Sequence, residues 1–142
     1  MKRAPALAPL SRDHLKALLA AKALREARDS PAATRQFLEF WHTEQHHFRI
    51  EEEVLLPWWD AHAHIDHAAA GRVLSEHLAL RADVLRLQQG LCSVEQLHDI
   101  GRRLDDHVRF EERELFPMIE QSLSADALEA LGAAVAAAEA DP

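Results

Sequence analysis

The sequence has little glycine and cysteine and no tyrosine. Four glycines and no tyrosine in 142 residues argue against a protein built from strands and tight turns. The single cysteine, Cys92, excludes an internal disulfide framework and a cysteine-based metal site. It also favours a reducing compartment, so we expect a cytoplasmic protein.

Long apolar runs and an excess of positive charge are missing too. No run approaches the ~20 apolar residues that span a bilayer. The basic start at Lys2 and Arg3 has the charge of a signal peptide, but the apolar part that follows is short and broken by Pro5 and Pro9. Sixteen basic residues against 24 acidic ones give a net charge of −8, which argues against nucleic acid. We therefore expect neither a membrane nor a nucleic-acid partner.

The chain does contain a large number of histidines, ten in all, and enough apolar residues (48%) to bury a core. Its length fits a single domain spanning residues 1–142. The function must be sought among the histidines.

Apolar residues recur with helical spacing, and no segment alternates with a period of two. Capping residues, prolines and a glycine delimit the expected helices. These run from Ser11 to Asp29, from Ser30 to the region of Pro57–Trp59, from Asp66 to Gly90, from Ser93 to the region of Pro117–Glu120 and, as a short fifth helix, within 125–140. The prediction is an all-α protein: an up-down-up-down four-helix bundle over about residues 10–120 with a short C-terminal helix.

An internal repeat supports two helical hairpins. The segment 47–57 (HFRIEEEVLLP) lies over 107–117 (HVRFEERELFP), with six of eleven positions identical at an offset of 60. Each block is preceded by a helix that carries an acidic residue directly before a histidine.

Counting along the helices places four histidines at one level. At 1.5 Å per residue, His14, His47, His77 and His107 each lie roughly 20–25 Å from the turn that joins the two helices of their hairpin. Glu51 and Glu111 follow His47 and His107 by four residues and share their helix faces. The pattern predicts one imidazole per helix and two carboxylates in the same layer.

These faces are otherwise apolar, and burying such polar groups without compensation is costly. A metal supplies the compensation. Imidazole with carboxylate suits iron, manganese, zinc or nickel, and two carboxylates suit a pair of metals. The alternatives are a bundle with surface histidines and a structural bundle that binds metal incidentally.

The pattern His14 … His47-x3-Glu51 … His77 … His107-x3-Glu111, with Leu-Leu-Pro and Leu-Phe-Pro after the two blocks, resembles the hemerythrin-like (HHE cation-binding) domains. The resemblance covers roughly residues 10–120. It implies a four-helix bundle with two iron ions joined by an oxo or hydroxo group. One iron would take His14 and His47 and the other His77 and His107, with Glu51 and Glu111 as bridges; other divalent metals are alternatives.

Two positions depart from the oxygen-carrying members that the chain resembles. Arg81 stands where they have a fifth histidine, and the fourth helix offers Glu111 or Glu112 where they have an aspartate. The internal repeat favours Glu111. A set of four His and two Glu is instead similar to the metal domain of repair-of-iron-centres proteins, without their additional Cys-containing domain. Five ligands per metal leave one position open on each, suited to O2, NO or azide.

Other polar groups offer weaker readings. Ferritin-like proteins use Glu-x-x-His, and Glu44…His47 and Glu95…His98 have that spacing but fall at different heights. A second, exposed metal site or a solvated loop would account for the remaining cluster, which comprises His62, His64 and His67. Three charged residues are candidates for orienting the ligand histidines: Asp13, Glu76 and Arg81.

The function expected from the sequence is a non-haem di-iron protein that binds O2 or NO or handles iron. The alternative is a di-iron oxidoreductase or peroxidase-type enzyme that uses the same centre. The surroundings of the metals separate the two: a proton donor favours chemistry, and an apolar pocket favours reversible binding.

Overall fold

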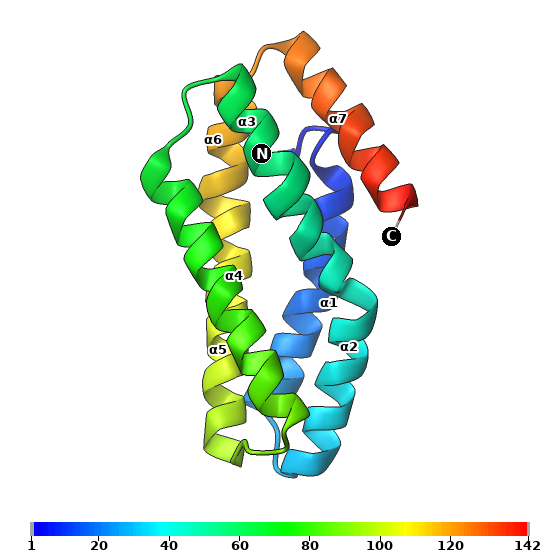
Figure 1. The fold of residues 1–142 in the computed structure, drawn as a ribbon, viewed down its shortest axis with the longest axis vertical. Helices are drawn as coiled ribbons and strands as arrows, with labels where there is room; N and C mark the ends of the chain where they lie inside the picture. The colour runs from blue at the N-terminus through cyan, green and yellow to red at the C-terminus, as the bar shows by residue number, and fades with distance from the viewer. Residues whose placement is uncertain (1, 142) are drawn as a thin grey trace.

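The computed structural model describes residues 2–141, and within this range the chain is all helical, with no strand (Figure 1). The helices are α1 (Ala8–Arg25), α2 (Ser30–Ile50), η1 (Glu51–Leu55), α3 (Leu56–His62), α4 (His67–Gln88), α5 (Val94–Phe110), η2 (Glu111–Leu115), α6 (Phe116–Ser122) and α7 (Ala125–Ala140). The elements α2, η1 and α3 form one continuous rod, as do α5, η2 and α6. Together with α1 and α4 these rods form the predicted up-down-up-down bundle, and α7 is the predicted short C-terminal helix.

Side-chain caps set most of the helix starts. Asp29, Asp66, Ser93 and Ser124 each accept a hydrogen bond from the backbone N–H three residues later. Ser93 and Gln96 form the predicted capping box. Gly90 closes α4 at a φ of 70°, a left-handed conformation that glycine adopts without a steric penalty.

The predicted start of the first helix was wrong by three residues. Helix α1 begins at Ala8, because Pro9 fits in a first helical turn, where its missing N–H leaves no bond unmade. Ser11 lies inside the helix and is not its cap. Its hydroxyl donates to Glu112 Oε2 at 2.8 Å, so this side chain serves a tertiary contact.

The predicted helix ends, within Pro57–Trp59 and Pro117–Glu120, were also slightly too early, since the rods continue to His62 and Ser122. A π-helical turn precedes each proline. In η1 the N–H of Leu56 donates to the carbonyl of Glu51, and in η2 Phe116 donates to Glu111. The wider turn shifts the hydrogen-bond ladder, so each proline enters the first turn of a new α-helical segment and the rod does not break.

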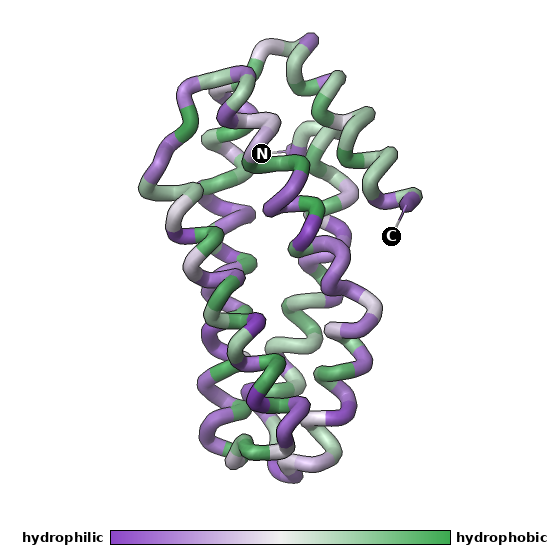
Figure 2. The backbone as a smooth tube through the Cα atoms, in the orientation of Figure 1, coloured by the Kyte–Doolittle hydropathy of each residue, from purple (hydrophilic) through white to green (hydrophobic). Residues whose placement is uncertain are grey.

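The core consists of two apolar clusters. The upper cluster includes Leu10, Ile50, Val73 and Phe110, and the lower cluster includes Ala17, Phe48, Leu80 and Leu104. Along α1 and α4 the two clusters are separated by one histidine, His14 and His77. Figure 2 shows hydrophobic and hydrophilic residues interleaved along the long helices of the bundle, as expected for amphipathic helices, whereas α7 is mostly hydrophobic.

Among residues 2–141, no helix has the length and apolar character needed to cross a membrane.

Candidate metal centre

The six residues singled out by the sequence meet in one buried layer. Helix α1 contributes His14, the α2–η1 rod His47 and Glu51, α4 His77, and the α5–η2 rod His107 and Glu111. Each histidine is at most 5% exposed and both glutamates are 0% exposed. The level predicted by counting residues is therefore the level at which the side chains converge.

The donor atoms form two groups that share both glutamates. One group comprises His14, His47, Glu51 and Glu111, and the other His77, His107, Glu51 and Glu111. Within each group the ligand atoms all lie within 4.8 Å of one another. This is the arrangement expected for two neighbouring ions with two carboxylates between them.

The glutamate oxygens face both histidine pairs. Oε2 of Glu51 lies 3.2 Å from His47 Nε2, and its Oε1 lies 3.2 Å from His77 Nε2. Oε1 of Glu111 lies 2.9 Å from His14 Nε2, and its Oε2 lies 3.2 Å from His107 Nε2. Each carboxylate therefore spans from one pair to the other.

The opposite nitrogen of every imidazole is held by a second carboxylate. The Nδ1 atoms pair as follows: His14 with Glu112 at 2.7 Å, His47 with Asp13 at 3.1 Å, His77 with Glu52 at 2.7 Å and His107 with Glu76 at 2.8 Å. A carboxylate at Nδ1 keeps the proton there and leaves Nε2, which faces the glutamates, free to bind a metal.

Sequence reasoning found two of these four carboxylates, Asp13 and Glu76, and missed Glu52 and Glu112. Their repetition could have revealed them, because Glu52 and Glu112 are the second glutamates of the two HxxxEE blocks. Glu112 binds the outer nitrogen of His14, whereas Glu111 is fully buried among the inner nitrogens. This geometry favours Glu111 as the residue that faces the centre of the layer.

Without a metal, the site favours protonated imidazoles. Burial opposes their protonation, but hydrogen bonds and the charges of Glu51 and Glu111 outweigh it. The pKa is raised to about 9 for His47 and His77, to about 10 for His107, and well above the usual range for His14. Positive charge is thus strongly preferred in this layer.

The glutamates show the complementary effect. Burial and the charge of Glu51 oppose ionisation of Glu111, yet the charge of the nearby His107 imidazole and the contact with His14 lower the pKa of Glu111 to about 2. Burial also opposes ionisation of Glu51, but the neighbouring imidazoles hold its pKa well below the usual range. Both carboxylates are ionised at neutral pH.

Several of these buried atoms make no hydrogen bond. They are His47 Nε2, both carboxylate oxygens of Glu51, and Glu111 Oε2. Unpaired polar atoms are rare in protein interiors because each costs free energy. Nitrogen and oxygen donors that point at one another without hydrogen bonds fit a pair of cations, and the cluster fits a di-iron site.

Comparison with known families decides the assignment. The family model described as the hemerythrin HHE cation binding domain matches residues 6–119. The chain belongs to this hemerythrin family. No curated protein and no solved structure gives a significant match.

Aromatic rings enclose the hemerythrin-type cluster. Phe48 packs edge-on against His47 and His77, with ring centroids 5.3 Å and 5.1 Å apart. Phe116 stacks on His14 at 5.3 Å with an interplanar angle of 13°. These contacts exclude water from the imidazoles and fix their planes.

The position that departs from oxygen-carrying hemerythrins contacts the cluster from outside. One guanidinium nitrogen of Arg81 lies 3.1 Å from both oxygens of Glu52, the carboxylate that holds His77. Arg81 therefore contacts His77 only indirectly, through Glu52, which is consistent with the predicted role of orienting a ligand histidine.

The ferritin-like alternative is not assembled in this hemerythrin domain. Glu44 binds Lys16 at 3.0 Å, and His98 contacts the backbone carbonyl of Ala27 at 2.9 Å. Among the described residues, neither side chain belongs to a group of possible metal donors.

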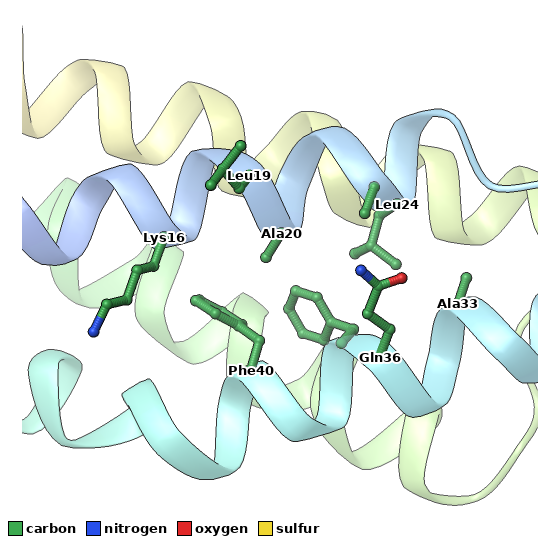
Figure 3. A pocket seen from close by; sticks show the side chains of 9 residues that line it. Lys16, Leu19, Ala20, Leu24, Ala33, Gln36 and Phe40 are labelled. Carbon is green, nitrogen blue, oxygen red and sulfur yellow. The ribbon is translucent and has the colours of Figure 1, made fainter.

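The remaining histidines and the neighbouring hollow lie apart from the cluster. His62, His64 and His67 are exposed, and within residues 2–141 they do not form a donor group. A hollow between α1 and α2 is lined mainly by apolar side chains, among them Leu19, Ala20, Leu24, Ala33 and Phe40 (Figure 3). None of the six clustered residues lines it, so the layer of donors is a separate feature of the fold.

Proposed function

We propose that this hemerythrin domain holds two iron ions, joined by an oxo or hydroxo group, and binds a small ligand such as O2 or NO. One observation carries the proposal: the carboxylates of Glu51 and Glu111 each reach from one histidine pair to the other. Single-metal sites do not need two carboxylates shared in this way.

The ligand assignment follows from the distances. His14 and His47 would hold one iron, and His77 and His107 the other. Glu51 and Glu111 would bridge the two. Bound iron would supply an open coordination position for the small ligand, because this set leaves one position free on each ion.

The protein's own residues favour binding over proton-coupled chemistry. Each imidazole Nδ1 is engaged by a carboxylate, so its proton faces away from the centre. Phe48 and Phe116 cover the imidazoles with apolar rings, and the sequence contains no tyrosine that could donate a proton. An apolar cover over the imidazoles suits a small uncharged ligand.

We also propose that residues 1–142 form one domain, although the family match ends at residue 119. Leu131 and Val135 of α7 are fully buried in the upper apolar cluster, together with residues of α1 and η1. Helix α7 is thus packed as part of the bundle core.

Metal analysis with an optical spectrum of freshly purified protein tests the proposal. We expect two iron ions per chain and, on titration with azide, binding to either iron. Saturation at one azide per centre, with the other iron six-coordinate through protein groups, would support a carrier with one open site. Catalytic consumption of peroxide by the iron-loaded protein would support the oxidoreductase alternative instead.

Arg81→His is the converse variant, since residue 81 lies four residues after His77 on the same face of α4. We expect the new imidazole to reduce azide binding at the iron of His77 and His107. Unchanged azide binding would show that residue 81 cannot reach the metal.

A further inference from the structure

Three of the four carboxylates that hold the imidazoles are themselves in contact with an arginine. Glu52 lies 3.1 Å from Arg81, and Glu76 accepts from Arg72 at 3.0 Å. Glu112 lies 3.5 Å from the guanidinium of Arg3, which also donates to the backbone carbonyl of Glu112 at 2.7 Å.

Asp13, which holds His47, is the exception. Within residues 2–141, the only basic side chain within 4.0 Å of its carboxylate is His47 itself. Its other neighbour is acidic: Glu139, from α7, lines the same surface cavity as Asp13. Lys16 is directed to Glu44, at 3.0 Å.

This difference changes how strongly each carboxylate accepts the Nδ1 proton. A guanidinium draws negative charge from a carboxylate and weakens it as an acceptor. Glu139 brings no positive charge to Asp13 in either of its protonation states. The Asp13 contact is longer, at 3.1 Å against 2.7–2.8 Å for the others, but no guanidinium contacts its carboxylate within the described residues.

The carboxylate affects the metal through the imidazole ring, because the hydrogen bond at Nδ1 changes the basicity of Nε2. A carboxylate that accepts strongly from Nδ1–H raises the basicity of the imidazole and makes Nε2 a better electron donor. Among the four imidazoles, only His47 is held by a carboxylate whose charge no arginine of residues 2–141 offsets. A stronger donor stabilises the higher oxidation state of the ion that it binds.

We infer that the two metal positions are electronically unequal and that Asp13 is the positioning residue that makes them so. The inference rests on the proposed di-iron function. The position at His14 and His47 favours the ferric ion, and the first electron given to a diferric centre by an added one-electron reductant goes to the position at His77 and His107.

Two matched variants test the sign of this effect. Asp13→Asn removes the uncompensated charge and raises the potential of the His14/His47 iron, so the gap between the two one-electron reductions narrows. Glu76→Gln weakens the corresponding acceptor at His107 and raises the other potential, so the gap widens. We expect the formation constant of the mixed-valent state to fall about tenfold in Asp13→Asn and to rise about tenfold in Glu76→Gln. Each change corresponds to a shift of about 59 mV in the difference between the two reduction potentials.

A third variant leaves every ligand contact in place. Glu139→Lys brings a positive charge to Asp13, as the arginines do at the other three carboxylates. We expect the difference between the two reduction potentials to narrow, as in Asp13→Asn. If Asp13→Asn fails to fold or to retain iron, Glu139→Lys tests the role of Asp13 in its place. Redox titration with Mössbauer detection follows both irons in each variant.

The iron count separates failure of this inference from failure of the proposed function. A wild-type chain that binds no iron pair overturns the proposed function and this inference with it. Two outcomes overturn the inference alone. In the first, the two bound irons of the wild type are reduced at the same potential. In the second, the difference between the two reduction potentials changes in the same direction in Asp13→Asn and Glu76→Gln. If either substitution only damaged the structure, iron occupancy would fall, but the difference between the two reduction potentials would not shift in opposite directions in the two variants.

Discussion

The donor layer and the lower apolar cluster are built on the same four rods and are equally buried, yet their chemistry is opposite. In the lower cluster, residues such as Leu97 and Leu104 are stabilised by removal from water. In the donor layer, burial opposes the charges of His47, Glu51 and Glu111, and only their mutual attraction keeps them ionised. One region supplies stability whether or not metal is present, and the stability of the other depends on the cations, protons or metal, that balance its carboxylates.

The largest expected effect is removal of a shared carboxylate. Glu51→Ala or Glu111→Ala deletes a group that faces both histidine pairs, and we expect bound iron to fall to near zero, measured as iron per chain after desalting. The metal-dependent part of the free energy of unfolding should be lost with it.

Neighbouring glutamates provide the controls. Glu52→Ala or Glu112→Ala removes only a partner of Nδ1 and should weaken iron binding by about 10–100-fold. Glu53→Ala changes an exposed residue and should leave iron binding unchanged. Equal losses in the Glu111 and Glu112 variants would mean that the bridge on the fourth rod is misplaced by one residue.

A substitution in the lower cluster should break the comparison from the other side. Leu97 is fully buried, and Leu97→Ala should lower the free energy of unfolding by about 2–5 kcal/mol. We expect the same loss with and without iron, measured by urea denaturation. A loss confined to the iron-loaded protein would show that the two regions are not independent.

The pH dependence of stability should invert when metal binds. In the metal-free protein the pKa of His107 is raised from 6.5 to about 10, so its contribution is fully present below pH 6.5 and is lost as pH rises through 10. The pKa of Glu111 is lowered from 4.5 to about 2, so its contribution is present above pH 4.5 and lost as pH falls through 2. We therefore expect the metal-free protein to have its highest free energy of unfolding between about pH 4.5 and pH 6.5, where both contributions are fully present.

Metal must displace the imidazole protons, so iron affinity should rise with pH up to about 9–10, where metal-free stability declines. Urea denaturation of both forms at several pH values, with proton release followed during metal addition, checks this inversion. Parallel profiles for the two forms would contradict it.

The smallest expected effect lies at the edge of the donor layer. Arg81→Gln removes contacts to Glu52, but the arginine side chain is 37% exposed. We expect the free energy of unfolding of the metal-free protein to change by less than about 1 kcal/mol, because water screens such pairs. Iron affinity should fall less than in Glu52→Ala; a larger fall would show that Arg81 itself reaches the centre.

Much of the donor layer could be predicted because helices have a fixed rise and the connections are short. Counting residues from each turn was sufficient to place His14 and His77 beside their partners. The π turns could not be predicted in this way, because a proline such as Pro57 signals a helix end unless the preceding turn widens. The roles of Glu52 and Glu112 depend on which neighbouring rod each one reaches, and helical spacing within one rod does not contain that information.

The long-range contacts of His14 have a consequence for synthesis on the ribosome. Helix α1 packs most extensively against α5, and both inner and outer partners of His14, Glu111 and Glu112, are 97 and 98 residues away in the chain. A nascent chain that ends at Gly90 carries three of the four imidazoles, but both donor groups still lack Glu111. We therefore expect the chain to retain metal only after the last long rod has been translated and docked, so that bound metal would mark a completed bundle.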